Sequence, residues 1–173
     1  MAITGDILAT YRGPRRVFAR LLTMGPREDR FLAILMAGCA LMFISRMPSL
    51  AREAHLTGQE QTMLLSNALF GIIFVAPLAL YTLALIAHVI ARVLRGTGES
   101  HAARLALFWS FLAASPLMLL NGLVAGMIGP GRELTLVGGL WFTVFLWFWI
   151  SGMYQGYWAK PQVKAQVKAQ VKA

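Results

Sequence analysis

Charged side chains are scarce in this sequence. They make up 13% of its 173 residues, against about 25% in a typical soluble domain. The only cysteine is Cys39, so the chain cannot form a disulfide within itself. No Lys, Arg, Asp or Glu occurs between Gln61 and Arg92. These scarcities argue against a soluble domain and favour a protein that lies in a membrane.

The sequence also lacks the patterns that catalysis and cofactor binding require. It contains no Walker loop and no dinucleotide-binding fingerprint. Its serines have no accompanying His and carboxylate for nucleophilic catalysis. His88 is the clear ionisable group inside an apolar run, and one histidine with no neighbouring ligands cannot form a metal or bis-histidine haem site. We therefore expect no enzyme activity, no cofactor and no metal.

Long apolar runs are abundant. A helix needs about 20 apolar residues to cross a hydrocarbon layer of ~30 Å, and backbone in lipid must satisfy its own hydrogen bonds. The sequence predicts an all-α integral membrane protein whose transmembrane domain, residues 31–158, has about four spans, at 31–47, 62–94, 102–128 and 134–158. The second span is too long for one perpendicular crossing. A tilt, an interfacial first turn or a re-entrant hairpin would fit, and we favour a helix kinked at Pro77.

Both ends of the chain are basic. In the predicted N-terminal segment, residues 1–30, Gly13-Pro14 separates two short helices, and the second is amphipathic. Its arginines Arg15, Arg16 and Arg20 are candidate contacts for anionic lipid, either on a helix in the headgroup layer or as a topology flank. The tail, residues 159–173, repeats lysine every fourth residue. Lys164 and Lys168 are candidate lipid contacts if it is helical, and a disordered basic tail fits equally well.

The net charge of +9 is explained by topology. Arginine and lysine gather before the first span, in the connector at residues 92–101 and in the tail. By the positive-inside rule this pattern places both termini in the cytoplasm, as four spans require. We expect a multi-pass protein of the inner (cytoplasmic) membrane, with lipid as a partner and no nucleic acid.

Several residues inside the spans are candidates for helix packing or contacts with a partner. Gly122 and Gly126 have the spacing that allows close helix approach. Polar amides among apolar residues usually join helices by hydrogen bonds, and Asn67 and Asn121 are of this kind. In the aromatic run of the last span, three tryptophans lie too deep to belong only to an interfacial belt: Trp141, Trp147 and Trp149. Of these, Trp147 and Trp149 are the candidates for helix packing or contacts with a partner.

One family resemblance rests on the order of the parts. A long helix leads through the connector RGTGES into HAARLALFWSFLAASPL, which ends in Ser115-Pro116, and a short loop and an aromatic last span follow. Residues 1–158 resemble the Yip (Ypt-interacting protein) family, in particular its short bacterial members from alphaproteobacteria. The resemblance implies a polytopic membrane protein. Eukaryotic relatives act in vesicle traffic with small GTPases and usually have five spans, whereas four are predicted here, and no catalytic residue carries over.

These observations predict a non-enzymatic membrane protein that packs with, or helps assemble, other membrane components. It would act as a scaffold or accessory subunit and contact other membrane proteins or a second copy of itself. A small transporter or channel subunit that works as an oligomer is the alternative, because Pro77, Pro116 and Asn121 could break helices around a solute.

Overall fold

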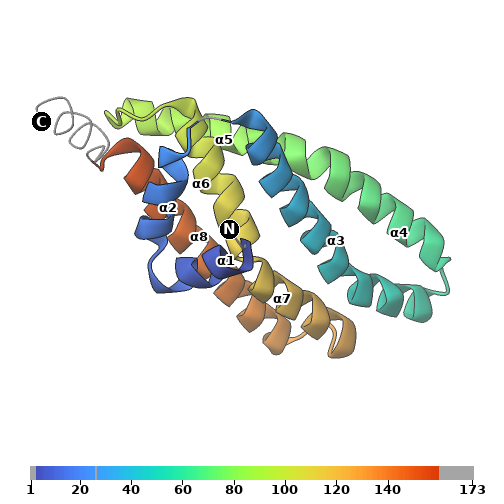
Figure 1. The fold of residues 1–173 in the computed structure, drawn as a ribbon. Helices are drawn as coiled ribbons and strands as arrows, with labels where there is room; N and C mark the ends of the chain where they lie inside the picture. The colour runs from blue at the N-terminus through green and yellow to red at the C-terminus, as the bar shows by residue number, and fades with distance from the viewer. Residues whose placement is uncertain (1–2, 26, 160–173) are drawn as a thin grey trace, which may run out of the picture.

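The computed structural model describes residues 3–25 and 27–159, which fold into helices joined by short connectors (Figure 1). In chain order the elements are α1 (Ile3–Arg12), α2 (Pro14–Thr23), α3 (Glu28–Thr57), α4 (Gln61–Phe70), the π-helical turn η1 (Gly71–Val75), α5 (Ala76–Val93), α6 (Ser100–Ala113), α7 (Ser115–Met127) and α8 (Arg132–Tyr157). The predicted all-helical fold class is confirmed.

Within the described ranges, three helices are long and apolar enough to cross a membrane: α3, the continuous helix α4–η1–α5, and α8. The pair α6 and α7 also qualifies, and it is bent by 47°. The chain is therefore a multi-pass membrane protein by helix length and hydropathy, with three spans, or four if the bent pair is one span.

Helix α3 is longer than the first predicted span. It continues through Pro48 and ends at Thr57, where Gly58 takes a left-handed conformation with φ of 67°. The predicted spans 31–47 and 62–94 would leave the residues between them as a connector. The segment after Pro48 contains Ala51, Glu53 and Ala54, which favour helix, so loss of one backbone hydrogen bond at the proline does not end the helix.

Each of the other two interior prolines adjoins a local irregularity. The π-helical turn η1 lies just before Pro77, and the helix runs on to Val93 without a break. At Pro116 the result is sharper, because α6 ends at Ala113 and α7 begins at Ser115. A proline has no N–H for the carbonyl four residues earlier, and its ring crowds that carbonyl, so a change of direction follows.

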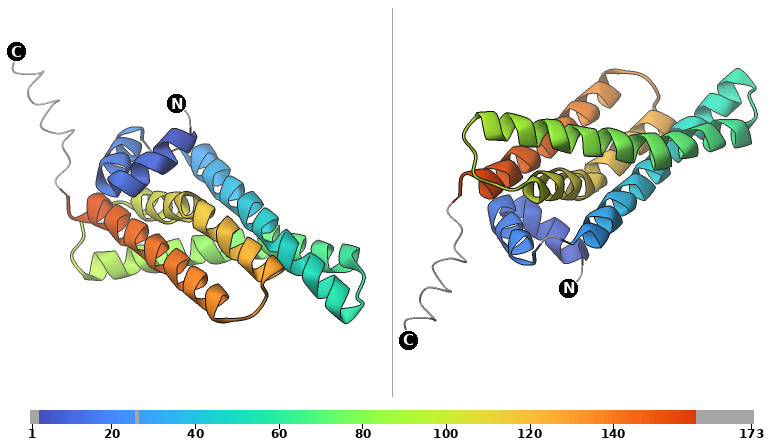
Figure 2. Two further views of the ribbon diagram at one scale, coloured as in Figure 1. Left: turned by 90° about the horizontal axis from the view of Figure 1, so that it is seen from below. Right: turned by 90° about the horizontal axis from the view of Figure 1, so that it is seen from above.

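Helix α6 forms the centre of the bundle (Figure 1). Every residue from 102 to 115 is buried except Arg104, which is half-buried. Helices α3, α5 and α8 pack around it, and glycine allows close contact: a Cβ at Gly38 would lie 2.6 Å from the ring of Phe111. The two views of Figure 2 place α4 and α5 along one side of the bundle and the α1–α2 hairpin on the opposite side.

The hairpin has the predicted break between α1 and α2, at Gly13. Its apolar face does not lie free for the headgroup layer, however. Val17, Phe18 and Leu21 are buried in the core, and the ring of Phe18 packs where a Cβ at Gly152 would lie. The amphipathic pattern in the sequence thus reflects docking onto α6 and α8.

Candidate functional site

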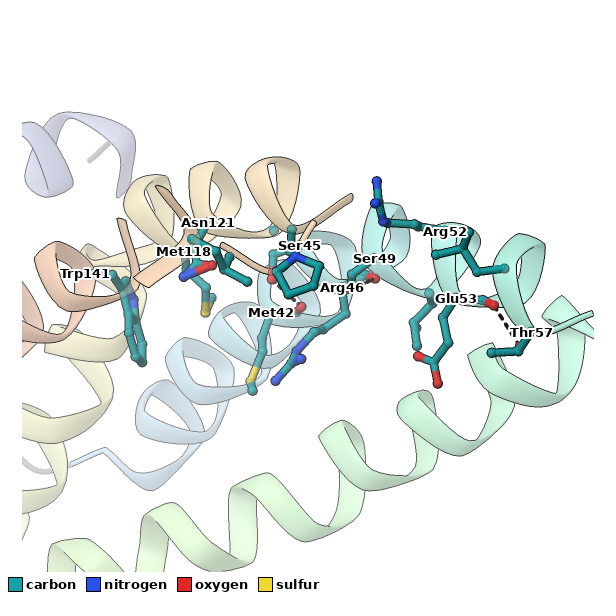
Figure 3. A pocket seen from close by; sticks show the side chains of 16 residues that line it. Met42, Ser45, Arg46, Ser49, Arg52, Glu53, Thr57, Met118, Asn121 and Trp141 are labelled. Carbon is teal, nitrogen blue, oxygen red and sulfur yellow. Dashed lines mark hydrogen bonds between the residues drawn. The ribbon is translucent and has the colours of Figure 1, made fainter. Parts of the chain in front are cut away.

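A groove of about 670 Å³ lies between α3 and α8, with α7 between them. Side chains from all three helices line it. The residues on which the following argument depends are Met42, Arg46, Arg52, Met118, Asn121 and Trp141. Figure 3 shows Trp141 and Asn121 toward one end of the groove and Thr57 at the other. We call this feature the α3/α8 groove.

Two glycines set the separation of the helices at the groove. A Cβ at Gly122 would lie 1.8 Å from the backbone oxygen of Ser45, and a Cβ at Gly126 would lie 2.3 Å from Cβ of Pro48. Real Cβ atoms do not approach other atoms so closely, so only glycine allows this crossing. The structure therefore places both predicted packing residues at the contact between α7 and α3.

Arg52 lies at the far end of the α3/α8 groove and links α3 to the end of α7. Its Nη1 donates to the carbonyl oxygens of Gly126 and Met127, at 3.5 and 3.4 Å. These carbonyls end α7, where a positive charge is favourable because it opposes the helix dipole. The Nε of Arg52 is buried and has no hydrogen-bond partner in the described part of the chain.

Trp141 presents a second donor without a partner. Its Nε1 is buried and makes no hydrogen bond with any described residue, while the side chain lines the groove. Asn121 faces the same space from α7, and its Nδ2 lies 3.1 Å from where a Cβ of Gly138 would be. An indole and a side-chain amide therefore line the deep end of the groove.

A separate polar cluster lies where α5 and α8 end. The Tyr157 hydroxyl is hydrogen-bonded to Nδ1 of His88 and lies 3.3 Å from the carbonyl oxygen of Glu99. The backbone N–H of Thr97 donates to the carbonyl oxygen of Tyr157 at 3.1 Å, so the connector wraps the ring. His88, the ionisable group noted in the sequence, is thus a structural partner of Tyr157.

The other predicted contact residues are scattered over the surface. Asn67 and Trp147 are exposed on α4 and α8. Trp149 is half-buried, and its ring centroid lies 5.9 Å from that of Phe145. The structure brings none of these three into the groove.

The predicted lipid contacts on α2 are exposed, but two of them have protein partners. Arg20 pairs with Asp6 across the α1–α2 hairpin. The guanidinium of Arg15 lies 5.0 Å from the ring centroid of Tyr154 on α8. Arg16 is exposed on the same helix. Lys164 and Lys168 lie outside the described residues.

Sequence reasoning missed most of the α3/α8 groove. The predicted spans, 31–47 and 62–94, put Arg46 at the end of a span and Arg52 in the connector that follows it. Their helical spacing from Ser45 and Ser49 places all four on the groove-lining side of α3, and this was the available signal. Trp141 was noted only as part of an aromatic run.

Comparisons of the chain with models of known protein families, with curated proteins and with solved structures find no match. Among the described residues, no group of three or more His, Cys, Asp or Glu side chains is placed to hold a metal ion. The geometry of the site therefore has to carry the functional argument.

Proposed function

We propose that this chain is a non-enzymatic scaffold or accessory subunit that packs with other membrane components. One observation carries the proposal: the longest apolar helix, α4–η1–α5, is only a peripheral part of the bundle. Only 11% of its most apolar stretch is buried. The side of this helix that faces away from the bundle is broad and apolar, and on it Phe74 is 63% exposed and Leu78 is 70% exposed.

The polar side chain on this helix supports a protein partner over lipid alone. Asn67 is exposed in α4, and a side-chain amide that faces hydrocarbon has no partner for its donors and acceptors. A helix of another subunit supplies such partners, and interhelical hydrogen bonds of this kind contribute about 0.6 kcal/mol each. The outward face of α4–η1–α5 is accordingly the contact surface of the proposal.

The proposal places the protein in the inner membrane with both termini in the cytoplasm. The basic residues before α3 and after α5 support this orientation through the positive-inside rule. Membership of the Yip family is part of the same proposal and rests on the order of the sequence parts, since no family model matches the chain.

Photo-crosslinking from single positions tests the contact surface. A photoreactive residue at Phe74 is expected to give a protein adduct in native membranes, or a covalent dimer of the purified chain in nanodiscs. The matched positions are Leu136, which is 73% exposed on α8, and Phe108, which is fully buried in α6. Neither is expected to give the same adduct.

Substitution of Asn67 by Leu is expected to lower the yield of the Phe74 adduct. Adducts with lipid alone at Phe74, or equal protein adducts at Phe74 and Leu136, would contradict the proposal. The first result would mean that lipid covers this face, and the second that the crosslinks report random collision.

A small transporter or channel subunit is the second candidate. It is favoured by one observation, the position of Asn121 in the α3/α8 groove, about two helical turns beyond the 47° bend between α6 and α7. Solute flux in proteoliposomes that Asn121→Leu abolishes and Asn67→Leu leaves intact would favour this function. An absence of flux for ions and small solutes would contradict the transporter function and leave the scaffold as the remaining proposal.

A further inference from the structure

Two hydrogen-bond donors on residues that line the α3/α8 groove have no partner in the described part of the chain. The indole N–H of Trp141 and the Nε–H of Arg52 are buried without partners in the described part of the chain. Ser45 and Ser49 each donate their hydroxyl hydrogen to a carbonyl of α3, so neither offers a further donor to a ligand. A buried donor without a partner is costly, so a ligand rich in acceptor oxygens fits this lining.

The charge of the lining points in the same direction. Two arginines face the groove, and the one carboxylate that lines it belongs to Glu53. Arg52 is engaged at the end of α7, whereas Arg46 forms no ion pair with any described residue. Figure 3 shows Arg46 and Glu53 extending from the same side of α3, two helical turns apart. Arg46 is thus the positive charge open to an anionic group.

The remainder of the lining is apolar. Met42, Met118 and Leu134 line the same space as Trp141. A ligand for the groove therefore needs an apolar part beside its oxygens. The volume of about 670 Å³ falls within the range of roughly 300–1,000 Å³ that is typical of small-molecule sites.

The length of α3 places the groove across a membrane boundary. Its 30 residues extend about 45 Å at ~1.5 Å per residue, beyond the ~30 Å of hydrocarbon. The groove follows the last turns of this helix, from Met42 to Thr57. Apolar and polar parts of one molecule would lie side by side at this depth, as they do in a lipid.

We infer that the α3/α8 groove binds one anionic phospholipid. The phosphate lies at Arg46, a glycerol ester carbonyl accepts the indole N–H of Trp141 deeper in the groove, and the acyl chains pass over Met42 and Met118 into the surrounding bilayer. Arg46 and the Trp141 N–H lie at different depths along the groove. A phospholipid has acceptor oxygens at two depths, in its phosphate and its esters, whereas a fatty acid has them only in its carboxylate. This site is independent of the outward face of α4–η1–α5.

Native mass spectrometry of the detergent-purified chain tests this site. Phosphatidylglycerol is compared with phosphatidylcholine of the same acyl chains. A single saturable phosphatidylglycerol adduct is expected, with an affinity about tenfold higher than that of phosphatidylcholine, the ratio that one charge-assisted contact supplies.

Two substitutions separate the two contacts. Arg46→Gln is expected to remove the difference between the lipids, because only the head group differs in charge. Trp141→Phe keeps the ring and removes the N–H, so it is expected to weaken both lipids by a similar, severalfold factor. Glu53→Gln is expected to strengthen phosphatidylglycerol binding by relieving repulsion.

Arg132→Gln is the matched control, because Arg132 is an exposed arginine on the first turn of α8. It is expected to change neither affinity. A thermal melting curve of each variant reports whether it folds. If Arg46→Gln does not fold, the binding of both lipids to Trp141→Phe still tests the site.

Several results would overturn the site. These are the absence of a saturable adduct, equal affinity for the two lipids, or a response of Arg132→Gln equal to that of Arg46→Gln. Oleate that binds as tightly without dependence on Trp141 would assign the groove to a fatty acid. Glycerol 1-phosphate that binds as tightly would show that the apolar part contributes nothing. The crosslinking at Phe74 is unaffected by any of these outcomes.

Discussion

The indole nitrogen of Trp109 lies in the centre of the bundle, and a residue almost a hundred positions earlier satisfies it. Its Nε1 donates to Oγ1 of Thr10 at 3.1 Å, and Thr10 in turn donates to the carbonyl oxygen of Asp6 at 2.7 Å. Both side chains are buried. This short chain of hydrogen bonds attaches the α1–α2 hairpin to α6.

Replacing Thr10 by Val keeps the shape of the side chain and leaves the indole N–H without a partner. We expect the variant to lose about 1–3 kcal/mol of unfolding free energy, since the cost falls on a buried donor. Thermal or denaturant unfolding in detergent measures this loss. Thr10→Ser should restore most of it, and Thr23→Val, which alters an exposed hydroxyl of α2, should have little effect. Equal losses in the two Val variants would contradict the assignment.

Tyr11 presents the reverse case. Its hydroxyl is buried without a partner among the described residues, while its ring packs edge-on against Phe148 with centroids 5.0 Å apart. Tyr11→Phe keeps the ring contact and removes the unsatisfied group, so we expect a gain of about 1 kcal/mol in unfolding free energy. A loss of stability would mean that the hydroxyl has a partner, such as water.

The same variant has a pH signature. Burial raises the pKa of the Tyr11 phenol above its ordinary value of 10.0. The folded state then holds the phenolic proton after the unfolded state has released it, so this group lowers stability as the pH rises above 10.0. Comparing the two unfolding curves from pH 8 to 11 isolates the effect: the advantage of Tyr11→Phe should grow above pH 10.0 and stay constant below it.

At the scale of helices, the contact between α3 and α7 depends on the absence of a side chain. We expect Gly122→Ala to destabilise the protein by about 3 kcal/mol, because its Cβ would lie 1.8 Å from the oxygen of Ser45 and the two backbones must separate. Gly139→Ala is the matched control on α8. Nothing lies within 4 Å of its Cβ, so it should be neutral or stabilise the helix by about 0.5–1 kcal/mol.

Unfolding of the two glycine variants in the same detergent checks the contrast. Equal effects at both positions would mean that the loss at Gly122 comes from helix propensity and that the crossing tolerates a methyl group.

The sequence predicted these elements better than it predicted their partners. The spacing of Gly122 and Gly126 indicated a close crossing, but it did not say that Ser45 and Pro48 of α3 lie opposite. Apolar side chains do not distinguish lipid from protein interior, so the sequence could not predict that most of α6 is buried while α4–η1–α5 is exposed. Arg52 was assigned to a connector for a related reason, because polarity suggested that the helix ended where it continues for about three more turns.

For the whole molecule, contacts fix the relative directions of the helices. Glu28, at the start of α3, pairs with Arg104 near the start of α6, at 2.7 Å. His88, near the end of α5, is bonded to Tyr157 at the end of α8. The Tyr157 hydroxyl also lies 3.3 Å from the carbonyl oxygen of Glu99, directly before α6, so the starts of α3 and α6 and the ends of α5 and α8 lie at one end of the bundle. If α6 and α7 cross the membrane as one span, successive spans run in opposite directions.

This alternation predicts which connectors share a side of the membrane. Single cysteines are introduced into a Cys39→Ala background at Gln59, Glu99 and Arg132, all exposed. We expect a membrane-impermeant maleimide to label positions 59 and 132 equally on intact cells, and to label position 99 only after permeabilisation, because the proposed orientation puts that arginine-rich connector in the cytoplasm. Cysteine at Thr4 should behave like position 99. Different labelling of positions 59 and 132 would mean that α6 and α7 do not cross as one span, since a bent pair that returns to its starting side would leave these two connectors on opposite faces.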